Sequence, residues 1–284
     1  MFYPVPLLCR WLQVSRSGFY YWKSKPVSAR SKQSNHILFH IIQAYKASRG
    51  TYGSPRVHHE LKTKGIKVGL NKIAKLMQKN GLFARSSAKH KKAKLARNKR
   101  GFAMNKLERD FYCDKPNTKW VSDTTFIQTR QGWLYLASII DLYSRKVIGW
   151  SMSNNNNTDL VKDALLMAVR QKDPHQKVLL HSDQGSTYRA DNYLALFNKN
   201  KIEQSMSAKG DCFDNAVAES FFGSLKQERG HWRNYETRYE AQQDVMNYIT
   251  MWYNSNRLHS YLGYQSPNDF ELKINELEKV AYLG

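Results

Sequence analysis

Three acidic side chains in distinctive contexts are the strongest chemical signal in this chain. They are Asp123 in W-V-S-D-T-T, Asp183 in H-S-D-Q-G-S-T-Y and Glu219 in N-A-V-A-E-S-F-F, and 35 residues lie between the last two. Magnesium prefers oxygen ligands and binds through one or two carboxylates together with water and substrate phosphate oxygens. Two such ions can clamp the attacking and leaving oxygens of a phosphoryl displacement. The three acids therefore predict a metal-dependent enzyme that acts on nucleic acid.

The elements that must position these acids are of three kinds. The sequence predicts that Asp123 lies within a strand, Asp183 at the carboxyl end of a buried strand, and Glu219 inside a helix. An aspartate in an apolar strand is costly unless it is paired or bound to metal. The alternative is that each acid only caps a turn or forms an ion pair. That alternative suits a single acid better than it suits Asp123 and Asp183 together.

A basic residue follows the third acid on the same predicted helix. Lys226 comes seven residues after Glu219, nearly two helical turns later, so both side chains share one face. A cation there suits a phosphate beside the metal ions, and Gly223 between them allows close approach of a DNA backbone. We predict that Lys226 binds DNA. An ordinary surface lysine would show the same spacing.

Other polar residues near these motifs are weaker candidates. Asp141 in I-I-D-L-Y-S-R is a rival carboxylate, but a pairing with Arg145 or a cap on the hairpin turn explains it better. His181 alternates with Asp183 along the strand, and ordinary packing is the default for it. Asn254 and Arg257 in the closing W-Y-N-S-N-R-L-H-S-Y segment are either structural or in contact with DNA.

The charge balance points to a polyanionic partner. The 284 residues include 45 Lys and Arg against 23 Asp and Glu, a formal net charge of +22. A hydrophobic fraction of 41% is ample for a packed core, so the chain is not a disordered polycation. Basic surfaces gain affinity for nucleic acid because neutralising phosphates releases counterions. A highly soluble basic protein without such a partner is the alternative.

Cysteine usage and hydropathy exclude several classes of protein. Cys9, Cys113 and Cys212 are widely spaced and form no C-x-x-C pair, so neither a zinc finger nor a disulfide framework is expected. The chain fits a reducing cytoplasm. No run of 18 apolar residues occurs, so we expect no membrane span. The apolar stretch at the N-terminus is too short for a secretory signal.

The first part of the chain predicts small helical DNA-binding regions. Residues 1–30 indicate a short helical segment like a helix-turn-helix, with Arg16 close to several aromatic residues. A small helical packing unit explains that pattern equally well. Residues 31–84 indicate a helical DNA-binding domain, in which Arg56 follows the T-Y-G-S-P turn. We predict that both arginines contact DNA.

A basic segment links these regions to the rest of the chain. Residues 85–112 contain the run K-H-K-K-A-K-L-A-R-N-K-R and too little apolar content for a core. We interpret the segment as a flexible linker that follows the DNA backbone, although many charge runs are merely solvated. The predicted DNA contacts are Lys91, Lys92, Lys94, Arg97, Lys99 and Arg100.

From residue 113 to 272 the pattern is that of a mixed α/β catalytic domain. Three antiparallel strands come first, followed by a helix N-capped at Thr158, a buried strand, a helix near 189–200 and a strand near 202–206. Two long helices follow, one beginning at Asp214 or Asn215 and carrying Glu219, the other from about 237 to 253. Residues 273–284 form a C-terminal tail. Alternation of helices and strands after an antiparallel start predicts a mixed sheet.

These motifs together resemble a known family. The three acidic contexts, the 35-residue gap, the closing N-x-x-R-L-H-S-Y-L-G-Y-x-S-P and the N-terminal V-S-R-S-G-F-Y-Y-W and T-Y-G-S-P-R-V-H-H-E-L are similar to those of bacterial insertion-sequence transposases of the IS3 family. The resemblance is to the second-reading-frame product, which has a core like that of retroviral integrases, and it covers nearly the whole chain. It implies a ribonuclease-H-like fold. It also implies that the protein works in the bacterial cytoplasm, in association with the nucleoid.

The resemblance also implies a mechanism and partners. Asp123, Asp183 and Glu219 would bind two divalent ions, Mg²⁺ or alternatively Mn²⁺. Water would cleave at the 3′ ends of the element, and the freed 3′ hydroxyl would attack another phosphodiester. Lys226 would contact the element end. The implied partners are double-stranded DNA of the terminal inverted repeats and of the target, an upstream-frame helix-turn-helix and leucine-zipper product or fusion, and further copies of the chain in a dimer or larger oligomer on DNA.

Two rival functions remain open at this point. One is a DNA-binding regulator with an inactive core, which the acidic triad argues against because such a core needs no carboxylates there. The other is a nuclease of the same fold that cuts DNA without joining it. Strand-transfer products, rather than any sequence feature, separate that nuclease from a transposase.

Overall fold

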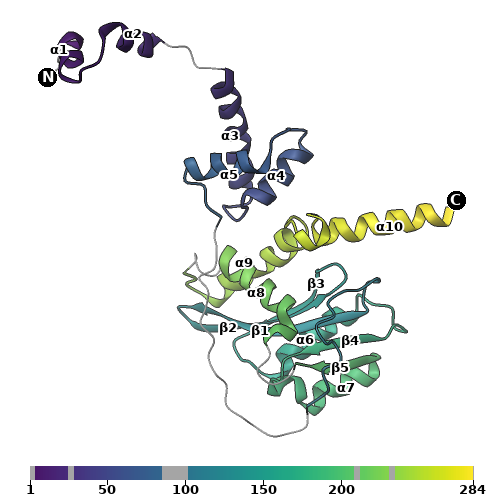
Figure 1. Cartoon of the computed structure of the whole chain (residues 1–284). Coiled ribbons are helices and arrows are strands. Elements are labelled where there is room, and N and C mark those ends of the chain that lie inside the picture. The colour runs from purple at the N-terminus through teal and green to yellow at the C-terminus, as the bar shows by residue number, and fades with distance from the viewer. Residues whose placement is uncertain (1–3, 25–28, 85–101, 208–211, 230–233, 284) are drawn as a thin grey trace. The chain divides into compact units, whose positions relative to one another are not determined.

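The structure is a computed structural model, and it describes residues 4–24, 29–84, 102–207, 212–229 and 234–283. The chain divides into two compact units, residues 1–84 and 85–284 (Figure 1). Each unit has its own buried residues. Of the described helices, none is both long and apolar enough to cross a membrane.

The N-terminal unit begins with the predicted pair of short helices. Helix α1 spans Val5–Trp11 and α2 spans Arg16–Ser24. The hydroxyl of Ser15 accepts a hydrogen bond from Gly18 N at 3.0 Å, so Ser15 caps the start of α2. Within residues 4–24 only Cys9 is buried. The pair therefore has little core of its own.

Three longer helices form the rest of this unit. They are α3 (Ala29–Ala47), α4 (Ser54–Thr63) and α5 (Leu70–Lys79). Gly65 and Gly81 follow α4 and α5 with φ of +76° and +66°, a left-handed conformation that glycine adopts without strain. The buried side chains that join the three helices are Ile37, Ile41, Val57, Leu61, Ile73 and Met77.

The second unit is built on a five-stranded mixed sheet. Its strands are β1 (Lys119–Thr129), β2 (Gly132–Asp141), β3 (Val147–Ser153), β4 (Val178–Ser182) and β5 (Ile202–Met206). Their order across the sheet is β3-β2-β1-β4-β5. The first three pair antiparallel, whereas β4 pairs parallel with both β1 and β5. The predicted mixed sheet with an antiparallel start is confirmed.

Helices cover both faces of this sheet (Figure 1). Helices α6 (Thr158–Val169) and α7 (Asp191–Lys199) pack on the face to which Trp120 points. Helices α8 (Ala216–Glu228) and α9 (Arg238–Asn247) pack on the opposite face, together with Val121. Neighbouring residues of β1 thus point to opposite cores, as the alternation of a strand requires.

The end of the chain is more regular than the sequence predicted. Helix α9 passes directly into a π-helical turn, η4 (Tyr248–Tyr253), so the predicted helix from 237 to 253 is present but changes its winding. Helix α10 spans Pro267–Leu283 and crosses the predicted boundary at residue 272 without a break. Short 3-10 turns lie at Ser186–Arg189 (η1), Cys212–Asn215 (η2) and Ser260–Leu262 (η5).

The structure describes only part of the segment predicted to be a linker. Residues 85–101, with all six of its predicted DNA contacts, lie outside the described residues. Residues 102–112 pack on the second unit, because Leu107 is buried and its backbone N–H donates to the Ser205 hydroxyl at 3.2 Å. Arg109 also forms an ion pair with Asp214 at 3.0 Å. The flexible-linker interpretation is therefore wrong for these residues, since one buried leucine anchors a polar segment.

A smaller correction concerns the start of α6. The N-cap is Asn157, whose side chain accepts a hydrogen bond from Leu160 N at 3.2 Å, and not the predicted Thr158. Asparagine is the stronger capping residue of the two.

Gly149 of β3 gives a test of this packing. A Cβ there would overlap the Ala164 carbonyl oxygen of α6 and lie 2.8 Å from Ala168 Cβ. We expect Gly149→Ala to lower the free energy of unfolding by about 1–3 kcal/mol, because backbone cannot move aside. Urea unfolding measures this. The control is Gly223→Ala in α8, where the new methyl meets nothing within 4 Å and helix propensity should add roughly 0.5–1 kcal/mol. Equal midpoints for the two variants would contradict the packing described.

Candidate active site and nucleic-acid interface

The register of two parallel strands brings the two aspartates together. Val121 of β1 pairs with His181 of β4, and this is the last pair between the two strands. Asp123 and Asp183 each lie two residues farther along, on the same face as the paired residues. Because neighbouring strands lie about 4.8 Å apart, the two carboxylates leave the paired region side by side.

Helix α8 brings the third acid to the same place. Asn215, the N-cap residue of α8, donates a hydrogen bond from Nδ2 to the Ser122 carbonyl oxygen at 3.1 Å. This bond fixes the start of the helix against the edge of β1 that β4 no longer pairs. Glu219 lies in the first turn of α8, with an exposed side chain. The helix start therefore sets how close Glu219 lies to the two aspartates.

The electrostatics of Asp123 show that the four charged groups meet. The pKa of Asp123 is raised to about 7, mainly by burial and also by the charges of Asp183 and Glu219, while the Thr124 N–H and Lys226 act in the opposite direction. Like charges near one another disfavour ionisation, so each acid disfavours the charge on its neighbour. The structure thus places three carboxylates and one ammonium group within electrostatic reach.

Asp183 is held by the turn that follows β4. Its Oδ1 accepts a hydrogen bond from Gly185 N at 2.9 Å. Burial raises the pKa of Asp183, and this hydrogen bond opposes the shift. A Cβ at Gly185 would lie 2.9 Å from the same oxygen and 3.3 Å from Tyr188 Cδ2. The turn therefore needs glycine to keep the Asp183 carboxylate where it is.

The donor chemistry of this cluster fits a hard divalent cation. All three groups offer carboxylate oxygens, which Mg²⁺ and Mn²⁺ accept. Their mutual repulsion, visible in the raised pKa of Asp123, is what a bound cation would relieve. Within the described part of the chain, no three His, Cys, Asp or Glu side chains stand close enough to form a ready-made ligand shell. Water and phosphate oxygens would have to complete any coordination.

Lys226 lies where the sequence pattern suggested, beside the acids. It is half-buried, and burial lowers the pKa of its ammonium group while the Asp123 charge raises it. Its Nζ lies 5.0 Å from the centroid of the Phe126 ring. The lysine therefore adjoins both the acidic cluster and an aromatic ring of β1 that sequence analysis did not single out. An exposed aromatic in a strand carries no sequence signal of its own.

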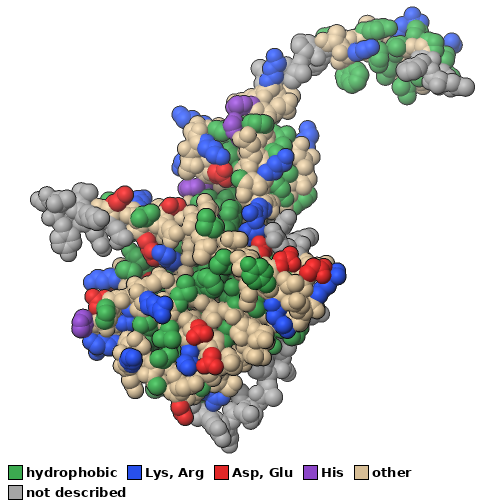
Figure 2. Space-filling view, turned by 180° about the vertical axis from the view of Figure 1, so that it is seen from behind, with side chains coloured by type: hydrophobic (Ala, Val, Ile, Leu, Met, Phe, Trp, Pro, Cys, Tyr) green, Lys and Arg blue, Asp and Glu red, His purple; other side chains and the backbone are tan. Residues whose placement is uncertain are grey.

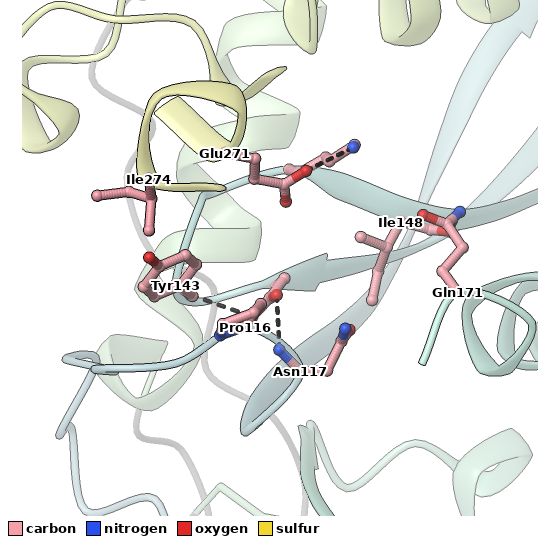
Figure 3. Close-up of a pocket in the computed structure, with 9 residues that line it drawn as sticks. Pro116, Asn117, Tyr143, Ile148, Gln171, Glu271 and Ile274 are labelled. Atoms are coloured by element: carbon pink, nitrogen blue, oxygen red, sulfur yellow. Dashed lines mark hydrogen bonds and ion pairs between the residues drawn. The ribbon is translucent and has the colours of Figure 1, made fainter. Parts of the chain in front are cut away.

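Asp141, the rival carboxylate, lies elsewhere. It is the last residue of β2, beside the start of β1, where it accepts hydrogen bonds from Asn117 N at 2.9 Å and Tyr143 N at 3.1 Å. It lines a cavity of about 240 Å³ together with Lys146 and Glu271 (Figure 3). Burial raises the pKa of Asp141 to about 6. As predicted, it caps the hairpin turn, and it takes no part in the acidic cluster.

His181 proves to be a structural residue. Its ring nitrogens lie 2.8 Å from the Ser205 hydroxyl and 3.0 Å from the Ser207 hydroxyl, and the side chain is fully buried. Burial lowers the pKa of His181 to about 4, so the ring is neutral at physiological pH. A neutral ring with both nitrogens engaged joins β4 to β5. It does not act as a proton carrier.

The closing segment of the core is structural as well. Asn254 exchanges two hydrogen bonds with the backbone of Val147 in β3, each 3.0 Å long. Arg257 donates from Nε to Glu228 of α8 at 3.0 Å and from Nη2 to the Ser224 hydroxyl at 2.8 Å. Both side chains are buried. The alternative that they contact DNA is therefore not supported by their positions.

The predicted DNA-binding residues of the first unit are spread over separate helices. Arg16 is exposed at the start of α2, and Arg56 of α4 lies 5.6 Å over the Tyr52 ring. Helix α5 buries Ile73 and Met77 and exposes a polar face. That face consists of Asn71, Lys75, Gln78 and Lys79. Glu60 is the sole acidic residue between residues 1 and 84, so the whole unit is cationic.

Basic side chains on the face in Figure 2 are scattered and do not form one patch. Lys and Arg appear over both units, with hydrophobic and acidic side chains between them. Such a distribution suits several separate contacts with a phosphate backbone rather than one deep cationic groove.

Family models match three stretches of the chain. An integrase core domain model matches residues 114–212, and a second integrase core domain model matches residues 219–274. An HTH-like domain model matches residues 32–91. The helix-turn-helix likeness therefore falls on α3, α4 and α5. The similar pattern seen in residues 1–30 stays a prediction.

Similar proteins span nearly the whole chain. Transposase InsF for insertion sequence IS3A of Escherichia coli (strain K12) is 39% identical over 273 residues, 95% of this chain and 95% of that protein. The "Insertion element IS600 uncharacterized 31 kDa protein" of Shigella sonnei is 36% identical over 271 residues, 95% of this chain and 99% of that protein. Among solved structures, the magnesium complex of the HTLV-2 integrase catalytic core domain (trimeric form) is 14% identical, with a TM-score of 0.43, over 55% of this chain and 96% of that chain.

The pKa of Asp123 gives a test of the acidic cluster. Because its folded value of about 7 exceeds the ordinary value of 3.8, folded Asp123 keeps its proton over this range while the unfolded chain loses it. Stability of the metal-free protein therefore falls as pH rises from about 4 to about 7. We expect Asp123→Asn to raise the melting temperature at about pH 8 and to leave it nearly unchanged at about pH 4. Thermal unfolding in the presence of a chelator measures both.

Asp110 of the same unit is a suitable control, because its pKa is shifted in the direction opposite to that of Asp123. Lys119 lowers the pKa of Asp110 through a hydrogen bond, so Asp110→Asn removes a favourable charge and should not stabilise the protein at high pH. Added Mg²⁺ should stabilise the wild-type protein at about pH 8 more than it stabilises Asp123→Asn. A melting temperature of Asp123→Asn below that of wild type at this pH would mean that the carboxylates do not repel one another.

Proposed function

Since the chain belongs to the IS3 family of insertion-sequence transposases, we propose that its core cuts DNA at the ends of the element and joins the freed 3′ hydroxyls to target DNA. Such an enzyme is a polynucleotidyl transferase, and its reaction is DNA transposition. The observation that supports this role for the core is the meeting of Asp123, Asp183 and Glu219 at the unpaired edge of β1. A regulator with an inactive core would gain nothing from such a costly cluster.

We assign the catalytic roles to the three acids. Asp123 and Asp183 offer their oxygens from adjacent strands, and Glu219 approaches from α8. These residues would hold two divalent ions, Mg²⁺ or alternatively Mn²⁺. Bound there, the ions would activate the attacking oxygen and stabilise the leaving oxygen of an in-line phosphoryl displacement. The β1 and α8 backbones keep the acids in place, because Asn215 joins the two elements.

Lys226 would bind a phosphate next to the reacting one. Its ammonium group lies close enough to affect the Asp123 carboxylate and is half-buried, so its charge is less screened than that of a surface lysine. It carries three donors and suits a phosphate as a point charge. The lysine thereby orients the DNA strand relative to the acids.

The N-terminal unit would bind the DNA ends of the insertion element in a sequence-specific manner. Helices α4 and α5 lie within the HTH-like match, and the polar face of α5 suits entry into a groove. The DNA partners are the terminal inverted repeats and the target duplex. We further propose that the chain works as a dimer or larger oligomer on DNA, together with the upstream-frame helix-turn-helix and leucine-zipper product or as a fusion to it.

Charge-neutral substitutions of the acids test the catalytic assignment. Asp183→Asn and Glu219→Gln should reduce cleavage and strand transfer by about 100-fold or more, because the ions lose a ligand, while binding to the element end persists through the basic surface. Labelled element ends incubated with Mg²⁺ and analysed for cut and joined products give the measurement. Asp163→Asn, an exposed acid of α6, is the matched control and should behave as wild type. Normal joining by either active-site variant would show that the metal site is misassigned.

Salt dependence tests the DNA contacts of α5. Lys75→Ala and Lys79→Ala should each weaken binding of the element end and reduce the slope of log affinity against log salt by about 1, because one phosphate contact is lost. Lys64→Ala is the control, since Lys64 already pairs with Glu60 at 2.7 Å and should change the slope less. Titrations by fluorescence anisotropy at several salt concentrations provide the slopes. Unchanged slopes for Lys75→Ala and Lys79→Ala would place the DNA on another face of the unit.

A further inference from the structure

Two aromatic rings are exposed on β1 and β2, one of them beside Lys226 of α8. Phe126 of β1 and Trp133 of β2 are 53% and 44% exposed, and their ring centroids lie 4.9 Å apart with the ring planes at 79°. They are diagonal neighbours, because Phe126 pairs with Tyr135 and Trp133 with Gln128. Isolated exposed hydrophobic residues are normal on protein surfaces. Two large rings in contact with each other present a continuous apolar surface instead.

The sheet itself does not require these rings. In the second half of β1, Thr125, Ile127 and Thr129 are buried whereas Phe126 and Gln128 are exposed. The covered face of this stretch is thus the one under α8 and α9. Phe126 and Trp133 lie on the other face. Replacing either side chain would therefore remove few contacts with the core. Their role must therefore be sought in what approaches them from outside.

Cationic groups lie beside the Phe126 ring and the Trp133 backbone. Lys226 Nζ lies 5.0 Å from the centroid of Phe126, and Arg238 donates from Nε to the Trp133 carbonyl oxygen at 3.0 Å. Lys226 is also the residue whose charge acts on Asp123. The same lysine therefore joins the aromatic pair to the catalytic carboxylates. A DNA strand bound at Lys226 is therefore within reach of the Phe126 ring.

We propose that the Phe126–Trp133 pair stacks against an unpaired base at the end of the DNA while Lys226 binds the adjoining phosphate. The proposal rests on the proposed transposase function. Proteins that hold single strands combine aromatic faces for the bases with cations for the backbone, and both are present here. A base that leaves the duplex at the terminus would allow the phosphodiester to approach Asp123 without the helix blocking it. The pair would then be a positioning element for the known class of reaction.

The test couples one side chain to one nucleotide. Trp133→Ala, Phe126→Ala and the double variant are titrated, in a chelator, with a duplex of the element's own terminus whose last base pair is intact, unpaired or replaced by an abasic site. We expect the double variant to bind the unpaired end at least about 5-fold more weakly than wild type, the loss that one base stack predicts. With the abasic end the two proteins should bind alike. Trp133→Phe, which keeps a ring, should restore most of the affinity.

A second readout follows the base directly. A fluorescent base analogue at the terminal position should be quenched on binding to wild type and to Trp133→Phe, but not on binding to the double alanine variant. Tyr112→Ala removes another exposed ring of the same unit, 69% accessible, and should leave both readouts unchanged. Circular dichroism and thermal melting of each variant establish that it is folded.

The outcomes separate this proposal from the proposed function. If the double variant binds all three ends as wild type does and quenches the analogue equally, the stacking proposal is overturned, whether or not the protein joins DNA. An equal loss of affinity for all three ends would also overturn it, because the rings would then contact the duplex rather than a base. If wild type neither cuts nor joins DNA but shows the base-dependent loss, the catalytic assignment fails and the binding site stands.

Discussion

Parallel pairing of β1 with β4 is the constraint on which the candidate site depends. Because Val121 pairs with His181, the chain carries Asp123 and Asp183 out of the paired region at the same level. The cost of this arrangement is electrostatic, since burial and the neighbouring carboxylates raise the pKa of Asp123 to about 7. The strands tolerate that cost because apolar cores on both faces and the bonds from His181 to β5 fix them from other directions. A divalent cation is the partner whose charge such a cluster calls for.

Helix α8 connects this edge of the sheet to the rest of the catalytic unit. Asn215 ties its first turn to β1, and Glu228 near its end accepts hydrogen bonds from Arg257 and Trp252. With both ends fixed, the helix cannot slide along the sheet, so the distance of Glu219 from the aspartates is set by contacts outside the acidic cluster. The buried Glu228–Arg257 pair therefore supports the site without touching substrate, and removal of either partner would leave a buried charge unpaired.

Binding of DNA requires positive charge, whereas binding of metal ions requires negative charge, and different parts of the chain supply the two. The chain as a whole carries a net charge of +22, yet Asp123, Asp183 and Glu219 lie near one another where β1 runs beyond β4. A cationic chain draws in DNA at long range, and a local acidic cluster retains cations at short range. Lys226 is the basic residue that lies near both the Asp123 carboxylate and the Phe126 ring. That position gives a single lysine contact with both the proposed chemistry and the proposed base stack.

Local sequence patterns were sufficient to predict most helices and strands and to single out the three acids as candidates. Periodicity placed β5 at residues 202–206, because local conformational preferences act over a few residues. It also supplied the three acids, since carboxylates in such apolar or small-residue contexts are conspicuous. Tertiary structure alone decided how close these acids come and what lies beside them. The packing of residues 102–112, the Asn215 bond and the Phe126–Trp133 contact join residues far apart or unremarkable in sequence. Strand register and helix docking are non-local, and no local pattern encodes them.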